Sequence, residues 1–77
     1  PVIAVKTVDI EGMHCENCKN SIERSVNKID GASCQVNLKK KQATIEVDRE
    51  IDDADIRIAI ERIDFKVTGI TTNRKEA

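Results

Sequence analysis

Apolar residues recur along the chain at two spacings, every second position in some stretches and every third or fourth position in others. Residues 5–10 alternate and are rich in β-branched side chains, which predicts a strand with Val8 and Ile10 facing the core. Gly12 ends this stretch. Residues 16–28 follow a helical spacing. The apolar positions that share one face there are Cys18, Ile22 and Val26, continued by Ile29.

Two further alternating stretches follow, and we expect them to form an antiparallel hairpin. Their apolar positions are Cys34, Val36 and Leu38 in the first stretch and Ala43, Ile45 and Val47 in the second. Residues 39–42 separate the two stretches, and the three lysines among them are typical of a solvated turn. Gly31 lies just past the first helical stretch, where a residue that tolerates positive φ is favoured.

An apolar stripe at positions three and four apart predicts a second helix. The stripe consists of Ile56, Ala59, Ile60 and Ile63. Asp52 or Asp53 is expected to be its N-cap, since aspartate accepts hydrogen bonds from the first turn. Residues 67–70 are expected to form a last short strand, and residues 71–77 a flexible tail.

The predicted order of elements is β-α-β-β-α-β in a single domain, residues 1–77, with its core at about residues 5–70. This order is that of the α+β ferredoxin-like fold, a four-stranded antiparallel sheet with two helices on one face. We further expect each crossover to connect parallel neighbouring strands.

Composition excludes several classes of function. Thirteen basic and fourteen acidic residues give a net charge of -1, and Phe65 is the one aromatic residue. Nucleic-acid binders usually carry a basic excess and stacking aromatic side chains, so we expect no nucleic-acid partner. The longest apolar run, residues 2–5, is far too short to span a membrane, and no signal peptide is visible. We therefore expect a cytoplasmic protein without direct membrane insertion.

Three cysteines, Cys15, Cys18 and Cys34, are the candidate chemical groups. Their odd number in a protein expected to be cytoplasmic favours metal or redox chemistry over a disulfide framework. Cys15 and Cys18 straddle the predicted helix start, where backbone N–H groups and the helix dipole favour thiolates. Paired thiolates suit a soft ion such as Cu(I).

The segment that begins at Gly12 and ends at Cys18, Gly-Met-His-Cys-Glu-Asn-Cys, resembles the Gly-Met-x-Cys-x-x-Cys signature of heavy-metal-associated domains. This family comprises small copper chaperones and the N-terminal metal-binding domains of metal-transporting P-type ATPases. The resemblance covers about residues 6–70 and includes the hairpin stretches at 36–38 and 43–47 and the helical segment 59–61.

This resemblance implies a protein that binds Cu(I) through Cys15 and Cys18. A single His and the lack of a His-Asp-Ser or paired-carboxylate arrangement predict that it is not an enzyme. The ion would pass by thiolate ligand exchange to a partner, either a copper-transporting P-type ATPase or a copper chaperone. The residues that the resemblance implies as supports of the metal loop are Gly12, Met13, His14 and Phe65. Met13 is expected to lie in the core, and Phe65 to pack partly in the core and partly over the loop.

The sequence departs from the family pattern at Asp64. The family commonly has glycine before the aromatic residue that matches Phe65. Aspartate tolerates the left-handed region better than most residues, so we expect the turn to be preserved.

Several alternatives stay open at this point. The same fold serves as a Zn(II), Cd(II) or Hg(II) domain, and His14 as an auxiliary ligand would favour Zn(II), which accepts mixed Cys and His ligands. A thiol–disulfide redox protein also uses Cys-x-x-Cys at a helix start. Cys34 is in phase with Val36 and is expected to point into the core.

Two questions about partners also stay open. A homodimer would form if two chains shared one metal ion through Cys15 and Cys18. Lys19 and Arg24 follow the candidate site on the predicted helix, where they would either steer an acidic partner or form a solvated face.

Overall fold

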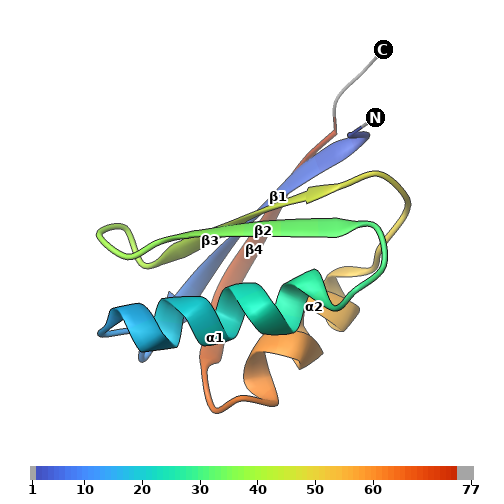
Figure 1. Ribbon diagram of the computed structural model, residues 1–77. Coiled ribbons are helices and arrows are strands. Elements are labelled where there is room, and N and C mark those ends of the chain that lie inside the picture. Colours follow the sequence, from blue (N-terminus) through green and yellow to red (C-terminus); the bar gives the residue numbers. More distant parts are fainter. Residues whose placement is uncertain (1, 75–77) are drawn as a thin grey trace.

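Four strands and two helices follow one another in the computed structural model, which describes residues 2–74 (Figure 1). In chain order they are β1 (Ala4–Glu11), α1 (Glu16–Asn27), β2 (Ala32–Asn37), β3 (Gln42–Val47), α2 (Asp53–Glu61) and β4 (Lys66–Arg74). Every pair of neighbouring strands is antiparallel, and both helices lie on one face of the sheet. The ferredoxin-like prediction is therefore confirmed.

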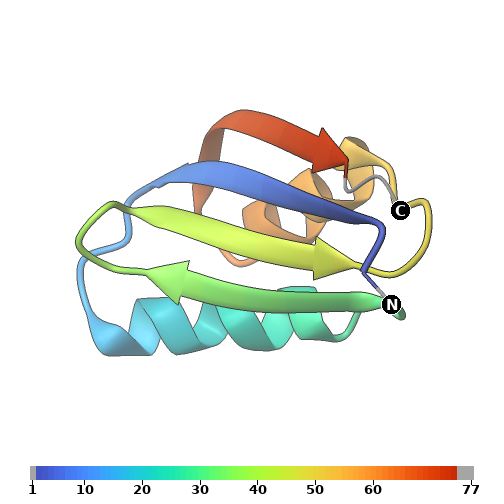
Figure 2. The same ribbon diagram turned by 90° about the horizontal axis from the view of Figure 1, so that it is seen from above.

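The strand order across the sheet is β2-β3-β1-β4 (Figure 2). β1 and β2 run parallel, but β3 lies between them, and β1 separates β3 from β4 in the same way. The expectation that each crossover connects neighbouring strands is therefore wrong, because each helix passes across one intervening strand. This arrangement brings β1 and β3 to the middle of the sheet and leaves β2 and β4 at its edges.

The core lies between the sheet and the two helices. Alternate residues of β1 are buried, among them Val8 and Ile10 as predicted, because successive side chains of a strand point to opposite faces. The helices contribute the apolar positions that their spacing predicted. These are Ile22 and Val26 from α1 and Ile56, Ala59 and Ile60 from α2.

β4 is longer than predicted. It extends to Arg74, so the prediction of a flexible tail is wrong for residues 71–74, and residues 75–77 lie outside the described part. Thr71 pairs with Thr7 and Arg74 with Ala4 in the register with β1. The exposed side chains of residues 71–74 give no apolar alternation, so hydrophobic patterning does not detect this half of the strand.

The observed ends of the helices agree in part with the ends predicted from the sequence. α2 begins after Asp52, one of the two predicted caps, although the Asp52 side chain makes no capping hydrogen bond. Gly31 has a φ of +89°, positive as predicted, but the C-cap of α1 is Lys28 and Gly31 lies in the turn into β2. A Cβ atom at Gly31 would collide with the side chains of Asp48 and Arg49. Neither helix within residues 2–74 is long and apolar enough to cross a membrane.

Candidate metal centre

A short loop, residues 12–15, joins β1 to α1 and carries the first part of the predicted metal motif; it is called the metal loop below. Gly12 has a φ of +90°, which turns the chain out of β1. Met13, next in the chain, is 1% exposed and packs in the core, as predicted. His14 and Cys15 are exposed. The buried Met13 therefore holds the loop to the core from beneath while the following residues remain at the surface.

The two cysteines of the motif lie together at the start of α1, as the sequence predicts. Cys15 is the N-cap residue with extended backbone, and its carbonyl oxygen accepts a hydrogen bond of 3.1 Å from the Lys19 N–H group. The Cys15 side chain makes no capping hydrogen bond. Cys18 lies in the first turn, and the two Sγ atoms are 3.2 Å apart. Cys15 is exposed and Cys18 is half-buried, so both thiols can be reached from one side.

The surroundings of Cys18 favour its thiolate form. A backbone hydrogen bond from His14 is the main cause that lowers the pKa of Cys18, and a hydrogen bond with the Cys15 thiol is the second. Both outweigh the opposing effect of partial desolvation. Because thiolates are the metal-binding and nucleophilic form of cysteine, this part of the loop suits a thiophilic ion.

Cys34 lies in β2 and is 5% exposed, so it points into the core as predicted. Burial raises the pKa of its thiol to about 12, and the carboxylate of Glu23 acts in the same direction. Cys34 therefore stays protonated at neutral pH and behaves as a small apolar side chain.

The segment that leads into β4 contacts the metal loop. Asp64 adopts the left-handed conformation, with a φ of +69°, so the turn is preserved where the family commonly has glycine. The next residue, Phe65, is half-buried and packs against the core. Its Cδ1 atom lies 3.8 Å from where a Cβ of Gly12 would be. The aromatic ring thus lies beside the first residue of the loop.

His14 is adjacent to Cys15 in sequence and exposed to solvent. Within residues 2–74, no group of three or more His, Cys, Asp or Glu side chains is arranged to hold a metal ion. The structure therefore brings together Cys15 and Cys18 and does not add His14 to them.

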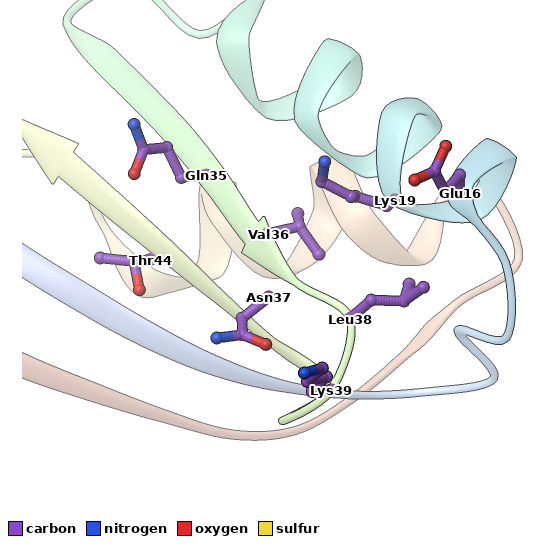
Figure 3. A pocket seen from close by; sticks show the side chains of 8 residues that line it. All are labelled: Glu16, Lys19, Gln35, Val36, Asn37, Leu38, Lys39 and Thr44. Atoms are coloured by element: carbon purple, nitrogen blue, oxygen red, sulfur yellow. The ribbon is translucent and has the colours of Figure 1, made fainter.

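A groove of about 450 Å³ lies beside the loop, between the first turn of α1 and the end of β2 (Figure 3). Lys19 contributes one wall and Lys39 another, with Val36 and Leu38 between them. Lys19 was singled out by its place on the predicted helix, but the groove was not predictable from the sequence, because α1 and the hairpin meet only in the folded chain. Arg24 lies further along α1 and is exposed.

Comparison with curated proteins finds copper-exporting P-type ATPases of Staphylococcus aureus among the relatives. The protein of strain Newman is 35% identical to this chain in an alignment of 75 residues that covers 84% of this chain. The protein of strain JH9 is 33% identical over the same length. The chain spans 9% of the length of these relatives.

Solved structures with this fold include the CopZ metallochaperone, with a TM-score of 0.79 and 32% sequence identity over 83% of this chain and 98% of that one. Another is the N-terminal domain of a potential copper-translocating P-type ATPase from Bacillus subtilis in the Cu(I)-loaded state. It has a TM-score of 0.78 and 29% identity and covers 97% of this chain and 99% of that one.

The sequence pattern that defines heavy-metal-associated domains matches residues 7–66, which include the Cys15–Cys18 pair and end at the first residue of β4. The match extends from β1 to the start of β4 and thus covers most of the chain described here. Together with the relatives above, it shows that this chain belongs to the heavy-metal-associated domain family.

Proposed function

We propose that this chain is a Cu(I) carrier that binds its ion through Cys15 and Cys18 and passes it to a partner. The observation that supports this most directly is the 3.2 Å approach of the two Sγ atoms at the exposed start of α1. The lowered pKa of Cys18 adds to it, because binding requires deprotonated thiols. The names of the copper-exporting and copper-loaded relatives point to the same ion.

The chemistry of the donor set favours Cu(I) over Zn(II). Soft thiolates select Cu(I), whereas structural Zn(II) takes four ligands in a tetrahedral arrangement. Cys15 and Cys18 offer two sulfur donors, and His14 is not grouped with them in the described residues. An ion held between the two sulfurs would require them to lie further apart than the observed 3.2 Å, and the separation would be wider for an ion with two ligands than for a tetrahedral ion. Cys15 can provide this movement because it lies in the loop rather than in the helix.

Transfer follows from the exposure of Cys15. A thiolate of the partner attacks the bound ion, and a new copper–sulfur bond forms before one bond to Cys15 or Cys18 breaks. A second partner thiolate then replaces the remaining bond. Copper stays in the Cu(I) state throughout, and each released thiolate takes up a proton given up by an incoming thiol. The chain acts as a carrier in this scheme and not as an enzyme.

The partner that fits this scheme is a copper-transporting P-type ATPase or a copper chaperone, in the reducing cytoplasm that keeps Cys15 and Cys18 as thiols. Docking is expected to be weak and to use a small contact around the loop. The groove with Lys19 and Lys39 is also lined by Glu16, which follows Cys15 in the chain, and it offers two amines to such a partner.

An anaerobic competition titration tests the proposal. The reduced protein is given Cu(I) in the presence of a strong Cu(I) chelator and, in a separate titration, Zn(II) in the presence of a zinc chelator. Because the chain has no Trp or Tyr, metal–thiolate absorption in the ultraviolet is easily observed. We expect Cu(I) retention that is lost in the variant Cys15→Ser/Cys18→Ser and kept in Cys34→Ala.

Two results would contradict this function. Tight Zn(II) binding that weakens in His14→Ala would make the site a mixed Cys and His zinc site. Retention of neither ion, together with a readily cycled Cys15–Cys18 disulfide, would indicate a thiol–disulfide redox protein.

A further inference from the structure

The two edges of the sheet differ in how their outward backbone groups are bonded. β2 lies at one edge of the sheet (Figure 2). Two of its outward N–H groups donate hydrogen bonds to side chains of α1. Asn27 Oδ1 accepts from the Cys34 N–H at 2.8 Å, and Glu23 Oε2 accepts from the Val36 N–H at 3.0 Å. These bonds close the β2 edge against pairing with a further strand.

The β4 edge has no such closure. The carbonyl group of Asp9 faces β4, because it accepts a hydrogen bond of 3.3 Å from the Thr68 hydroxyl, and Asp9 pairs with Gly69 in the register. Backbone groups alternate between the two sides of an antiparallel strand, so the N–H and C=O groups of Gly69, Thr71 and Asn73 point toward β1. The N–H and C=O groups of the residues between and after them point outward, and these residues are Ile70, Thr72 and Arg74. Within residues 2–74, these outward groups have no hydrogen-bond partner.

An apolar groove of about 420 Å³ lies beside this open edge, between α2 and β4. Ile58 of α2 and Ile70 of β4 line it, and Ile58 is 62% exposed. No other large apolar side chain within residues 2–74 is exposed. The rim carries both signs of charge, with Arg57 next to Glu61 on the same helix.

We propose that the β4 edge and this groove form the interface of a homodimer in which β4 pairs antiparallel with β4 of a second copy. Two copies related by a two-fold axis present the same surface to each other, so the outward donors of one strand meet the outward acceptors of the other. Ile58 of each copy becomes buried against the same surface of the second copy.

The charges at the rim fit a second copy of the chain. A two-fold axis places the Arg57–Glu61 side of one copy against the same side of the other, so each Arg57 gains an acidic neighbour as well as a basic one. A rim with a single sign of charge would repel its own copy. The mixed rim therefore favours self-association over a partner with one dominant charge.

The position of the interface leaves the metal loop free. The start of β4 adjoins the loop, since Lys66 pairs with Glu11, but the outward residues Ile70, Thr72 and Arg74 lie in the half of β4 that leads away from it. Dimerisation through β4 therefore requires neither metal nor Cys15 and Cys18. It differs in this respect from a homodimer in which two chains share one ion.

Sedimentation velocity of the reduced, metal-free protein from about 10 µM to about 1 mM tests the proposal. We expect association that rises with concentration and is unchanged in Cys15→Ser/Cys18→Ser. Ile58→Glu should weaken the dimer about tenfold or more, because it removes apolar area from both copies. Asn20→Glu makes the same change of charge at an exposed position of α1 and should leave association unchanged.

Amide hydrogen exchange identifies the pairing itself. The N–H groups of Ile70 and Thr72 should exchange more slowly at the higher concentration, while that of Thr71, which faces β1, should not change. A protein that stays monomeric at about 1 mM overturns the proposal. So does a dimer that Ile58→Glu leaves intact, that the double serine variant abolishes, or that leaves exchange at Ile70 and Thr72 unaltered.

Discussion

The local surroundings of a residue determine its reactivity in this chain, and the three cysteines show this most clearly. Cys15 and Cys18 lie at the surface of a helix start, where hydrogen bonds lower the pKa of Cys18. Cys34 has the same side chain, but burial raises its pKa to about 12. The alternation of apolar residues in β2 predicted this difference, because Cys34 is in phase with Val36 and both are buried.

The buried thiol of Cys34 should make the protein less stable in alkali. The unfolded chain releases this proton near pH 9.0 and the folded chain near pH 12, so the unfolded state binds fewer protons between these values and stability falls as pH rises. We expect the free energy of unfolding to decrease in this window by roughly 1 kcal/mol per pH unit from this group.

Urea unfolding followed by far-ultraviolet circular dichroism, in reductant at several pH values, measures this decrease. At pH 7 Cys34→Ala should be less stable by about 1–2 kcal/mol, because it leaves a small cavity. The difference between wild type and variant should shrink above pH 9.0. Since the lysines and the surface thiols titrate in both proteins, a difference that stays constant with pH would contradict the assignment.

The backbone conformation of Asp64 also affects stability through a single residue. Its left-handed conformation costs about 1–2 kcal/mol for residues with a branched Cβ, less for aspartate and nothing for glycine. We expect Asp64→Val to lower the free energy of unfolding by about 1–2 kcal/mol and Asp64→Gly to leave it equal or raised. Arg62→Ala, at an exposed neighbour with a φ of -65°, is the control and should change it by less than about 0.5 kcal/mol. Equal stability of the valine and glycine variants would refute this account.

At the scale of elements, hydrophobic spacing predicted the strands and helices that contribute buried faces and missed what depends on backbone pairing. β1, β2 and β3 alternate because one face of each is covered by helices. The second half of β4 consists of exposed residues held by its register with β1, and the strand order depends on contacts between distant segments. The Cys15–Cys18 pair was predictable because its spacing and its place at a helix start are local features. The groove beside it was not.

A partly buried ion pair joins three elements and was also missed. Lys6 is 7% exposed in β1, and its Nζ donates hydrogen bonds to Asp53 Oδ1 at 2.7 Å and to Thr72 Oγ1 at 3.1 Å. The sequence did contain a signal, because Lys6 is in phase with the inward residues Ala4 and Val8. A lysine at such a position needs a partner, and α2 and β4 supply the two oxygens.

Removing the carboxylate of this ion pair should lower the free energy of unfolding more than replacing the lysine with an uncharged side chain. Asp53→Ala leaves the Lys6 ammonium without its carboxylate, and we expect a loss of about 1–3 kcal/mol, reduced from the value for fully buried pairs because Asp53 is half exposed. Lys6→Met fills the same space without a charge and should lie within about 1 kcal/mol of wild type. Asp55→Ala removes another acid from the same helical turn and serves as the control for the helix dipole. Urea unfolding would contradict the argument if Lys6→Met were as destabilised as Asp53→Ala.

At the scale of the whole molecule, the candidate site and the Arg74–Glu50 ion pair lie at opposite ends of the sheet. The end of β1, the start of β4 and the hairpin turn meet at the metal loop, since Glu11 pairs with Lys66 and the Ile10 N–H donates to Lys41 O. At the other end Arg74 binds Glu50 through two hydrogen bonds of 2.6 and 2.9 Å. The core lies between the two ends. Of the two proposed ligands, Cys15 is exposed and Cys18 packs only at the margin of the core, so they contribute little to the packing that stabilises the fold.

This separation predicts that metal adds to stability without being needed for folding. In the absence of metal, Cys15→Ser/Cys18→Ser should unfold within about 0.5 kcal/mol of wild type, because Cys15 is exposed and Cys18 half-buried. Cu(I) buffered at about 100 times its dissociation constant should stabilise wild type by about 2.7 kcal/mol and the double variant not at all. Cys34→Ala is less stable but should gain as much from Cu(I) as wild type, since Cys34 lies in the core, away from the loop. Anaerobic urea unfolding with and without buffered Cu(I) gives all three values. If the stabilisation by Cu(I) persists in the double serine variant, or disappears in Cys34→Ala, the binding site does not lie at the loop.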